Sequence, residues 1–501
     1  MGDENTVLTE NDVRHVMRRA GFGAPPKELA KLLKQAKKRQ NPPTRGAVAE
    51  SLLDYKPKLF KPGGSDRYKA HNKWVSYLQK PKSPLQSKLV LFWHDHFSTQ
   101  VSVVGEMKIM AVQIRLLHEY AKGNFKDFVK AINRDAAMME MLDTVRNKKA
   151  VPNENYAREL KELFTLGVDD LAGNSNYTED DVSQIARAFT GWDYEYPKGT
   201  PYMDDNDHDY EAQFPSRGPK VVFQTTGGFG PAGRDFTVNG EGEAEIDTVT
   251  DILFDHTDSD GENTVARRIT RRLLRFFCHD DYANPGPAEI AVIDQIIADS
   301  GFASTWDLQA LYRAIFVHDV FFETAAPAPY GPGTKKAVKW PVDYFVSTLR
   351  LTGMKLRTSD RRVLGGSYRT AYGHLSQMGQ ILLEPPSVFG WSWDTAWLNS
   401  ATLLARFRFA RDIVAAREGG RFQPEKLVDL DLSDPGEIVD AVADSLGIPD
   451  QVTTNERNIY IDYLTDNGSN PALDLNDSYE RNTKLHGLYA LMMQSPAYQL
   501  H

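Results

Sequence analysis

Residues 153–167 of the chain read Asn153-Glu154-Asn155-Tyr156-Ala157-Arg158-Glu159-Leu160-Lys161-Glu162-Leu163-Phe164-Thr165-Leu166-Gly167. At 100° per residue, Asn155, Glu159 and Glu162 fall on one stripe, with Arg158 beside it. A second stripe is apolar and consists of Tyr156, Leu160, Leu163 and Phe164. The pattern predicts an amphipathic helix with one face against a core.

The two carboxylates of this segment allow two interpretations. On a partly buried face, Glu159 and Glu162 need a cation, a proton or an arginine to offset their charge. This requirement makes the polar stripe a candidate site. Alternatively, the stripe is a solvated helix face on which Arg158 pairs with Glu162.

A second candidate segment is Leu91-Phe92-Trp93-His94-Asp95-His96-Phe97, which lies in one of the most apolar parts of the chain. Neutral imidazole is a common metal ligand, and a neighbouring carboxylate can orient it. The apolar pattern of residues 85–97 favours a helix, on which His94 and His96 point about 200° apart. We therefore expect one metal ligand, His96; a second ligand, if there is one, would be His94. The alternative is a core histidine bonded to a carboxylate.

Several longer segments carry a family resemblance. They are residues 15–23 (HVMRRAGFG), 177–192 (YTEDDVSQIARAFTGW), 266–277 (ARRITRRLLRFF) and 385–391 (PPSVFGW), together with the two segments above. In this order they resemble the bacterial family called domain of unknown function 1800. The resemblance implies a mainly helical fold and no established reaction. It also implies frequent export and a possible companion protein, because members are often encoded beside a second exported family.

The periodicity predicts an all-α protein, a multi-helical bundle with an irregular, loop-rich insertion. Residues 1–193 read as an N-terminal helical region that holds the candidate site, and Thr178 has the features of an N-cap. Residues 194–242 are rich in Gly, Pro and Asp and read as the insertion. Residues 243–417 form a second helical region, and residues 418–501 an acidic, turn-rich segment with a closing helix. Near the N-terminus, Asn11 or Asp12 is the expected cap of the first helix.

Composition excludes several classes of protein. Lys and Arg number 59 and Asp and Glu 68, a formal net charge of −9, which argues against a general nucleic-acid binder. Basic clusters lie at residues 31–39 and at Arg267, Arg268, Arg271, Arg272 and Arg275; the second set covers more than one helix face, so some of its members must be paired. The lone Cys278 excludes an intrachain disulfide and a thiolate metal cage.

Targeting signals are also missing from the chain as written. No apolar run reaches the roughly 18 residues that span a bilayer, and the acidic N-terminus does not resemble a signal peptide. We expect a cytoplasmic protein without a membrane span; the alternative is an exported protein whose leader was removed. The acidic run of residues 204–209 lacks the glycine and terminal glutamate of an EF-hand, so a solvated loop is the expectation there.

Three indoles, Trp391, Trp393 and Trp397, lie within seven residues. Stacked indoles suit sugars, cations or flat ligands, although a corner between packed helices would use them as well. Downstream, Asn399, Arg406 and Arg408 could orient an anionic group.

Two functions from different classes remain open. In the first, the protein is a metal-dependent enzyme of unknown reaction, and a divalent ion (iron, manganese or zinc) is bound by His94, His96, Glu159 and Glu162. Arg158 or Arg187 would stabilise negative charge, and Asn155 would hold a ligand carboxylate or a water. In the second, the protein is a non-catalytic helical binding or scaffolding protein. The same residues then form a buried polar network, and the indole corner binds a ligand or a partner.

Overall fold

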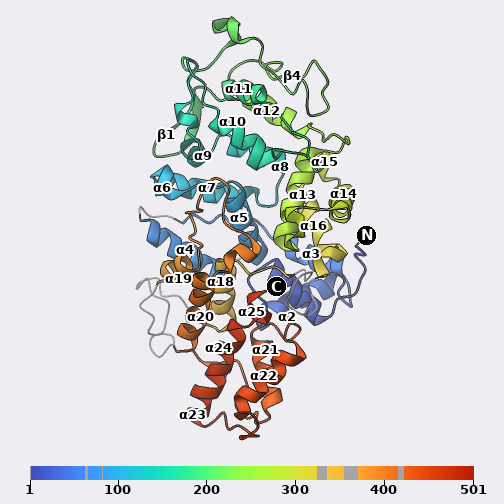
Figure 1. The fold of residues 1–501 in the computed structure, drawn as a ribbon, viewed down its shortest axis with the longest axis vertical. Helices are drawn as coiled ribbons and strands as arrows, with labels where there is room; N and C mark the ends of the chain where they lie inside the picture. Colours follow the sequence, from blue (N-terminus) through green and yellow to red (C-terminus); the bar gives the residue numbers. More distant parts are fainter. Residues whose placement is uncertain (1, 63–65, 82, 324–335, 355–369, 416–421) are drawn as a thin grey trace.

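The computed structural model describes residues 2–62, 66–81, 83–323, 336–354, 370–415 and 422–501. Figure 1 shows an elongated molecule with the irregular insertion at one end and the last helices at the other. Within the described ranges, the only sheets are two short two-stranded ones. The all-α prediction is therefore confirmed.

The N-terminal region consists of short helices. They are α1 (Glu10–Arg19), α2 (Pro26–Arg39), α3 (Arg45–Leu53), α4 (Arg67–Gln79), α5 (Pro84–His96), α6 (Val101–Val104), α7 (Met107–Tyr120), α8 (Phe125–Ile132) and α9 (Ala136–Met141). Thr9 caps α1 in a capping box with Asp12, so the expected cap at Asn11 or Asp12 was wrong. Thr9 is the N-cap because Asp12 lies three residues later, where its carboxylate accepts a hydrogen bond from the Thr9 backbone N–H.

Helix α5 lies at the centre of the molecule. Every residue from Leu85 to His96 is buried, so this helix packs on all sides. This central position explains why apolar residues occur on every face of the helix and why its polar side chains do not contact solvent.

The quoted stretch begins as α10 (Asn155–Glu159) and continues as the π-helix η2 (Leu160–Thr165). The helix α11 (Glu179–Ala188) follows, and the predicted N-cap at Thr178 is confirmed as a capping box with Asp181. Because a π-helix bonds each residue to the fifth one along, the 100° rule ends at Glu159. Glu162 nevertheless stays close to Arg158, at 3.6 Å, and its charge acts on Glu159.

The loop-rich insertion is present between α11 and α12. It contains the antiparallel pair β1 (Trp192–Glu195) and β2 (Thr200–Met203), the shorter pair β3 (Val221–Val222) and β4 (Arg234–Asp235), and the turns η3 (Glu211–Gln213) and η4 (Pro215–Arg217). Buried ion pairs hold it in place: Arg187 of α11 bonds Asp209 at 3.2 Å, and Lys220 bonds Glu245 at 2.7 Å.

Helices resume after the insertion. They are α12 (Glu245–Phe254), α13 (Thr264–Phe277), α14 (Pro287–Ser300), α15 (Phe302–Thr305), α16 (Leu308–Val317), α17 (Asp319–Phe322), α18 (Pro341–Leu351), α19 (Ala371–Gln377), α20 (Ser400–Val414), α21 (Pro435–Ser445), α22 (Thr454–Thr465), α23 (Ser478–Glu480), α24 (His486–Gln494) and α25 (Pro496–Gln499), with the turns η5 (Asp280–Ala283), η6 (Asp394–Trp397), η7 (Pro424–Lys426) and the π-helix η8 (Arg481–Leu485). A further turn, η1 (Thr144–Arg146), lies before the insertion, between α9 and α10. None of the helices in the described part of the chain is long and apolar enough to span a membrane. The predicted boundaries between regions stay a prediction.

The last residues of the chain return to the middle of the molecule (Figure 1). Leu500 forms a bridge with Val338, and His501 exchanges backbone hydrogen bonds with Ala337. The final residues thereby lie beside α1, whose Arg19 donates to the His501 carbonyl at 2.9 Å.

Candidate functional site

Arg158 is surrounded by carboxylates in the structure. Its guanidinium donates two hydrogen bonds, of 3.0 and 2.7 Å, to the carboxylate of Glu179 on α11. Glu154 and Glu162 lie 3.4 and 3.6 Å away. The hydrogen bonds to Glu179 raise the pKa of Arg158, so the residue is a permanently charged structural cation.

The other residues of the predicted stripe have unequal surroundings. Asn155 is exposed, and its backbone N–H donates to Asn153. Glu162 accepts a hydrogen bond from the Tyr177 hydroxyl. Glu159 is half-buried, its Oε2 has no hydrogen-bond partner, and burial together with the charge of Glu162 raises its pKa.

Lys161 lies in the same segment, and sequence reasoning overlooked it. Its side chain is fully buried, with the amine 5.0 Å from the centre of the Tyr177 ring. The amine makes no hydrogen bond, and burial lowers its pKa to about 7. The only sequence signal was a lysine on the otherwise apolar side of a helix.

The two histidines of α5 occupy aromatic surroundings. The His94 ring lies 5.4 Å from Trp74 and 5.2 Å from Trp391, neither of its nitrogens has a hydrogen-bond partner, and burial lowers its pKa to about 3. His96 Nε2 lies 3.1 Å from the Phe164 carbonyl of η2. Burial and the charges of Arg272 and Arg268 hold the pKa of His96 well below its usual range. Both histidines are therefore neutral near pH 7.

The four predicted ligands do not form one metal-binding group. Among the residues that the structure describes, no three His, Cys, Asp or Glu side chains are grouped so that they could hold a metal ion. His96 meets η2 through a backbone carbonyl instead of through Glu159 or Glu162. The geometry thus gives the iron, manganese or zinc site no support, and metal binding stays a prediction that needs metal analysis.

Asp95, between the two histidines, is the residue that joins the resemblance-bearing segments. Its buried carboxylate accepts the Trp391 backbone N–H at 2.7 Å and the Arg272 guanidinium at 3.2 Å. The Trp393 side chain also hydrogen-bonds to it, and burial raises its pKa to about 6. Gly390 permits this approach: its φ is +86°, and an added Cβ would lie 2.6 Å from the Asp95 carbonyl oxygen.

The arginines of α13 separate into two faces. On one face, Arg267 is buried and bonds Asp258, Asp260 and Asp294. On the other face, residues three and four apart form what we call the arginine stripe: Arg268, Arg271, Arg272 and Arg275. The expected internal pairing is confirmed for Arg267.

Only some of the guanidinium groups in the arginine stripe have a carboxylate partner among the residues that the structure describes. Arg272 forms an ion pair with Asp95, and Arg275 forms one with Asp280 at 2.5 Å. Arg268 donates only to the Glu162 carbonyl, and Arg271 donates to the carbonyls of residues 282 and 283. Mutual repulsion adds to burial in lowering the pKa of Arg271. The stripe therefore carries net positive charge on a partly buried face.

Trp393 covers part of this stripe. The guanidinium carbons of Arg275 and Arg272 lie 4.8 and 5.6 Å from its ring centre. Trp393 is half-buried, whereas Trp391 and Trp397 are buried and pack around Trp340. The predicted indole corner thus exists, and Trp393 is its accessible member.

The polar residues downstream of the indole corner, which were expected to orient an anionic group, have other roles in the structure. Arg406 is fully buried and donates to the Lys339 carbonyl at 2.7 Å and to Gln499 at 3.0 Å. Asn399 caps α20, and Arg408 is exposed. Arg187, the other proposed charge stabiliser, is held by Asp209. Arg406 and Arg187 are structural because each one is buried against a fixed acceptor.

Two other sequence features are Cys278 and the acidic run of residues 204–209. Cys278 is buried, and burial raises the pKa of its thiol to about 12, so the residue is an inert thiol. The expectation of a solvated loop at residues 204–209 was wrong for the end of the run, because Asp209 is buried against Arg187. Two of the other acids are paired singly: Asp207 with Lys148 at 2.8 Å, and Asp205 with the Tyr210 hydroxyl at 2.6 Å.

Comparison with known proteins identifies the family. The model of the family described as protein of unknown function (DUF1800) matches residues 15–500, so the chain belongs to this family. Neither a curated protein nor a solved structure matches the chain.

Proposed function

We propose that this member of the DUF1800 family is a non-catalytic helical binding protein. In this proposal, the His/Glu segments form a structural polar network. The ligand is an organic anion with a flat ring, and the arginine stripe of α13 binds it beside Trp393.

The imbalance of charge along the stripe carries the proposal. Four partly buried guanidinium groups face two carboxylates, those of Asp95 and Asp280. Arginine presents five N–H donors in a fixed fork, and such forks match carboxylate and phosphate groups. Donors that find only carbonyl oxygens within the protein remain available to a stronger, anionic acceptor.

The aromatic part of the ligand follows from Trp393. Its indole is half-exposed and already lies against two cations, so a flat ring can stack beside it while the anionic group meets the arginines. The cavity behind it, lined by Lys88, Arg275 and Trp340, measures only about 20 Å³. This volume holds about one water, which confines the ligand to the outer side.

The network around Arg158 supports the non-catalytic part of the proposal. A catalytic arginine needs donors that are free for the reacting group, but the Arg158 fork is occupied by Glu179. The arrangement ties α10 to α11, as a structural ion-pair network does.

Thermal melting with four small probes tests the proposal. Phenyl phosphate and benzoate supply both a charge and a ring; inorganic phosphate lacks the ring, and benzyl alcohol lacks the charge. The two ringed anions should raise the melting temperature most, because a ligand at a hundredfold excess over its Kd stabilises the native state by about 2.7 kcal/mol. Equal effects of phenyl phosphate and benzyl alcohol, or no effect of any probe, would overturn the proposal.

A further inference from the structure

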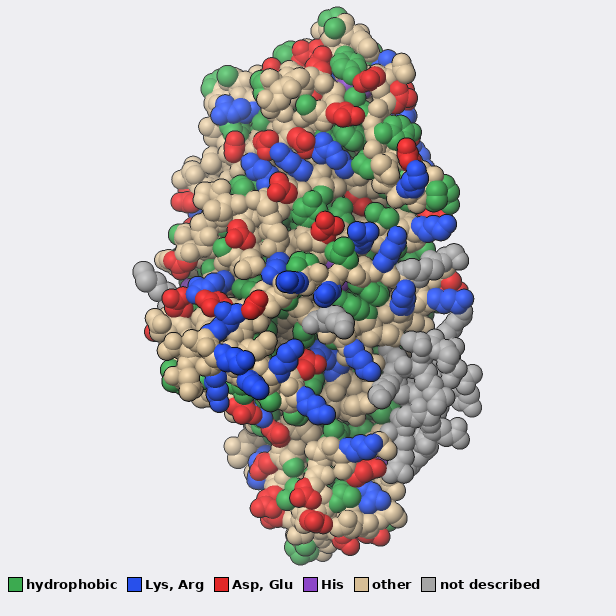
Figure 2. All heavy atoms as spheres, turned by 180° about the vertical axis from the view of Figure 1, so that it is seen from behind, with side chains coloured by type: hydrophobic (Ala, Val, Ile, Leu, Met, Phe, Trp, Pro, Cys, Tyr) green, Lys and Arg blue, Asp and Glu red, His purple; other side chains and the backbone are tan. Residues whose placement is uncertain are grey.

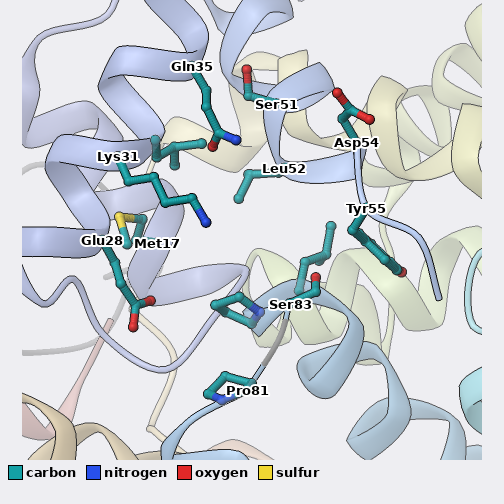
Figure 3. A pocket seen from close by; sticks show the side chains of 13 residues that line it. Met17, Glu28, Lys31, Gln35, Ser51, Leu52, Asp54, Tyr55, Pro81 and Ser83 are labelled. Carbon is teal, nitrogen blue, oxygen red and sulfur yellow. The ribbon is translucent and has the colours of Figure 1, made fainter. Parts of the chain in front are cut away.

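A second pocket opens far from the arginine stripe, between the N-terminal helices. It measures about 250 Å³ and is bordered by α1, α2, α3 and the start of α5 (Figure 3). Its lining combines polar side chains with a group of apolar ones: Met17, Leu32, Leu52, Pro81, Pro84 and Leu85. The volume has room for several water-sized groups, which suits a small ligand.

The polar side chains at this pocket come mainly from α2 and α3. Figure 3 shows the Lys31 side chain extending into the middle of the pocket, with the Gln35 amide beside it. Ser51 lies next to Gln35, and Tyr55, across the pocket from Lys31, turns its hydroxyl away from the centre. Lys31 is thus the charged group that a bound molecule would meet.

The two carboxylates at the rim are already neutralised. Glu28 accepts a hydrogen bond from Arg350 at 2.5 Å, and Asp54 accepts one from Arg39 at 2.7 Å. Lys31, in contrast, has no hydrogen-bond or ion-pair partner among the residues that the structure describes. The pocket therefore presents one uncompensated positive charge near the apolar side chains of Leu32, Leu52 and Leu85.

The surroundings strengthen this charge. Helix α2 also carries Lys27, Lys34, Lys37 and Lys38, all of them exposed. On the face shown in Figure 2, Lys and Arg side chains gather in the lower half of the molecule, in the region of α2. Such a field raises the local concentration of anions around a protein whose net charge is −9.

We propose that this pocket binds a small amphiphile with a single anionic end, such as a short-chain aliphatic carboxylate. Lys31 would hold the anionic group at the mouth, and the aliphatic chain would cover Leu32, Leu52 and Leu85. This site is separate from the arginine stripe, so either proposal can fail without the other.

Calorimetric titration of the full chain with hexanoate tests the inference. Hexanoate should bind, whereas hexanol and hexylamine should bind at least tenfold more weakly. Lys31→Gln should weaken hexanoate binding about tenfold, and Lys34→Gln, one turn along the same helix but outside the pocket, should leave it unchanged.

Two results would contradict the inference: no heat of binding with hexanoate, or equal weakening by both lysine substitutions, which would indicate a general effect of surface charge. Because Lys31 is exposed, its substitution leaves the fold intact. A second variant, Leu52→Trp, fills the pocket without changing charge and should also abolish binding; circular dichroism checks its fold.

Discussion

At the scale of single residues, the structure separates residue types that the sequence pattern grouped together. Arg158 and Glu162 are neighbours on one helix, as their spacing predicts. The stronger partner of Arg158 is Glu179, which is 21 residues away and which no helical spacing could reveal. The same holds for Asp95, because its partners, Trp391 and Arg272, belong to distant segments.

Glu159 gives a prediction at this scale. Its carboxylate is half-buried, lacks a partner at Oε2 and is repelled by Glu162. Glu159→Gln should therefore leave the melting temperature unchanged or raise it, and protein purified without a His tag should contain no stoichiometric iron, manganese or zinc before or after the change. A metal site would behave in the opposite way: elemental analysis would find near-stoichiometric metal in the wild type and less in the variant, and a chelator would lower the melting temperature.

At the scale of elements, the hydrophobic periodicity of the sequence predicted where helices form better than it predicted their helical geometry. The capping box at Thr178 follows from the local sequence alone, and so does the amphipathic character of α10. The π-helix of residues 160–165 does not follow from the helical period, and this segment packs against α13 and α12, which are distant in sequence. A π-helix turns a different set of side chains inward, so Lys161 becomes buried while Glu162 stays near the surface.

The contact between α5 and the 385–391 segment can be tested through Gly390. Gly390→Ala should cost about 2 kcal/mol or more, because the new Cβ collides with Asp95 and the backbone is left-handed. Displacement of Trp393 should also weaken binding of phenyl phosphate. Gly105→Ala is the matched control: its φ is +73° and nothing lies within 4 Å of the added Cβ, so the cost should be only about 1 kcal/mol. Equal losses in urea unfolding would contradict the close contact with Asp95.

At the scale of the whole molecule, buried histidines set the response to acid. Burial lowers the pKa of His94 to about 3 and the pKa values of His71, His118 and His256 to about 4. Each is neutral in the folded protein but takes up a proton in the unfolded chain below pH about 6.5. Since the unfolded state then binds more protons, the free energy of unfolding should fall as the pH drops from about 6.5 to 4.

Two aspartates act in the opposite direction over part of this range. Burial raises the pKa of Asp95 to about 6 and of Asp135 to about 7, so these groups favour the folded state as the pH falls. The four histidines outnumber them, and the net effect should be destabilisation. In the His94→Leu variant, the free energy of unfolding should depend less steeply on pH, by up to about 1.4 kcal/mol per pH unit. Urea unfolding at several pH values measures this slope, and an unchanged slope would show that His94 is not buried in neutral form.

The most direct test of the proposed function is a calorimetric titration of phenyl phosphate into the wild type, Arg275→Gln and Arg115→Gln. Arg275 belongs to the stripe and lies against Trp393, whereas Arg115 is an exposed arginine on α7. We predict saturable binding to the wild type, about tenfold weaker binding to Arg275→Gln, as expected for the loss of one charge-assisted contact of about 1.4 kcal/mol, and no change for Arg115→Gln. Undiminished binding to Arg275→Gln, or no binding to the wild type, would contradict an anion site on α13.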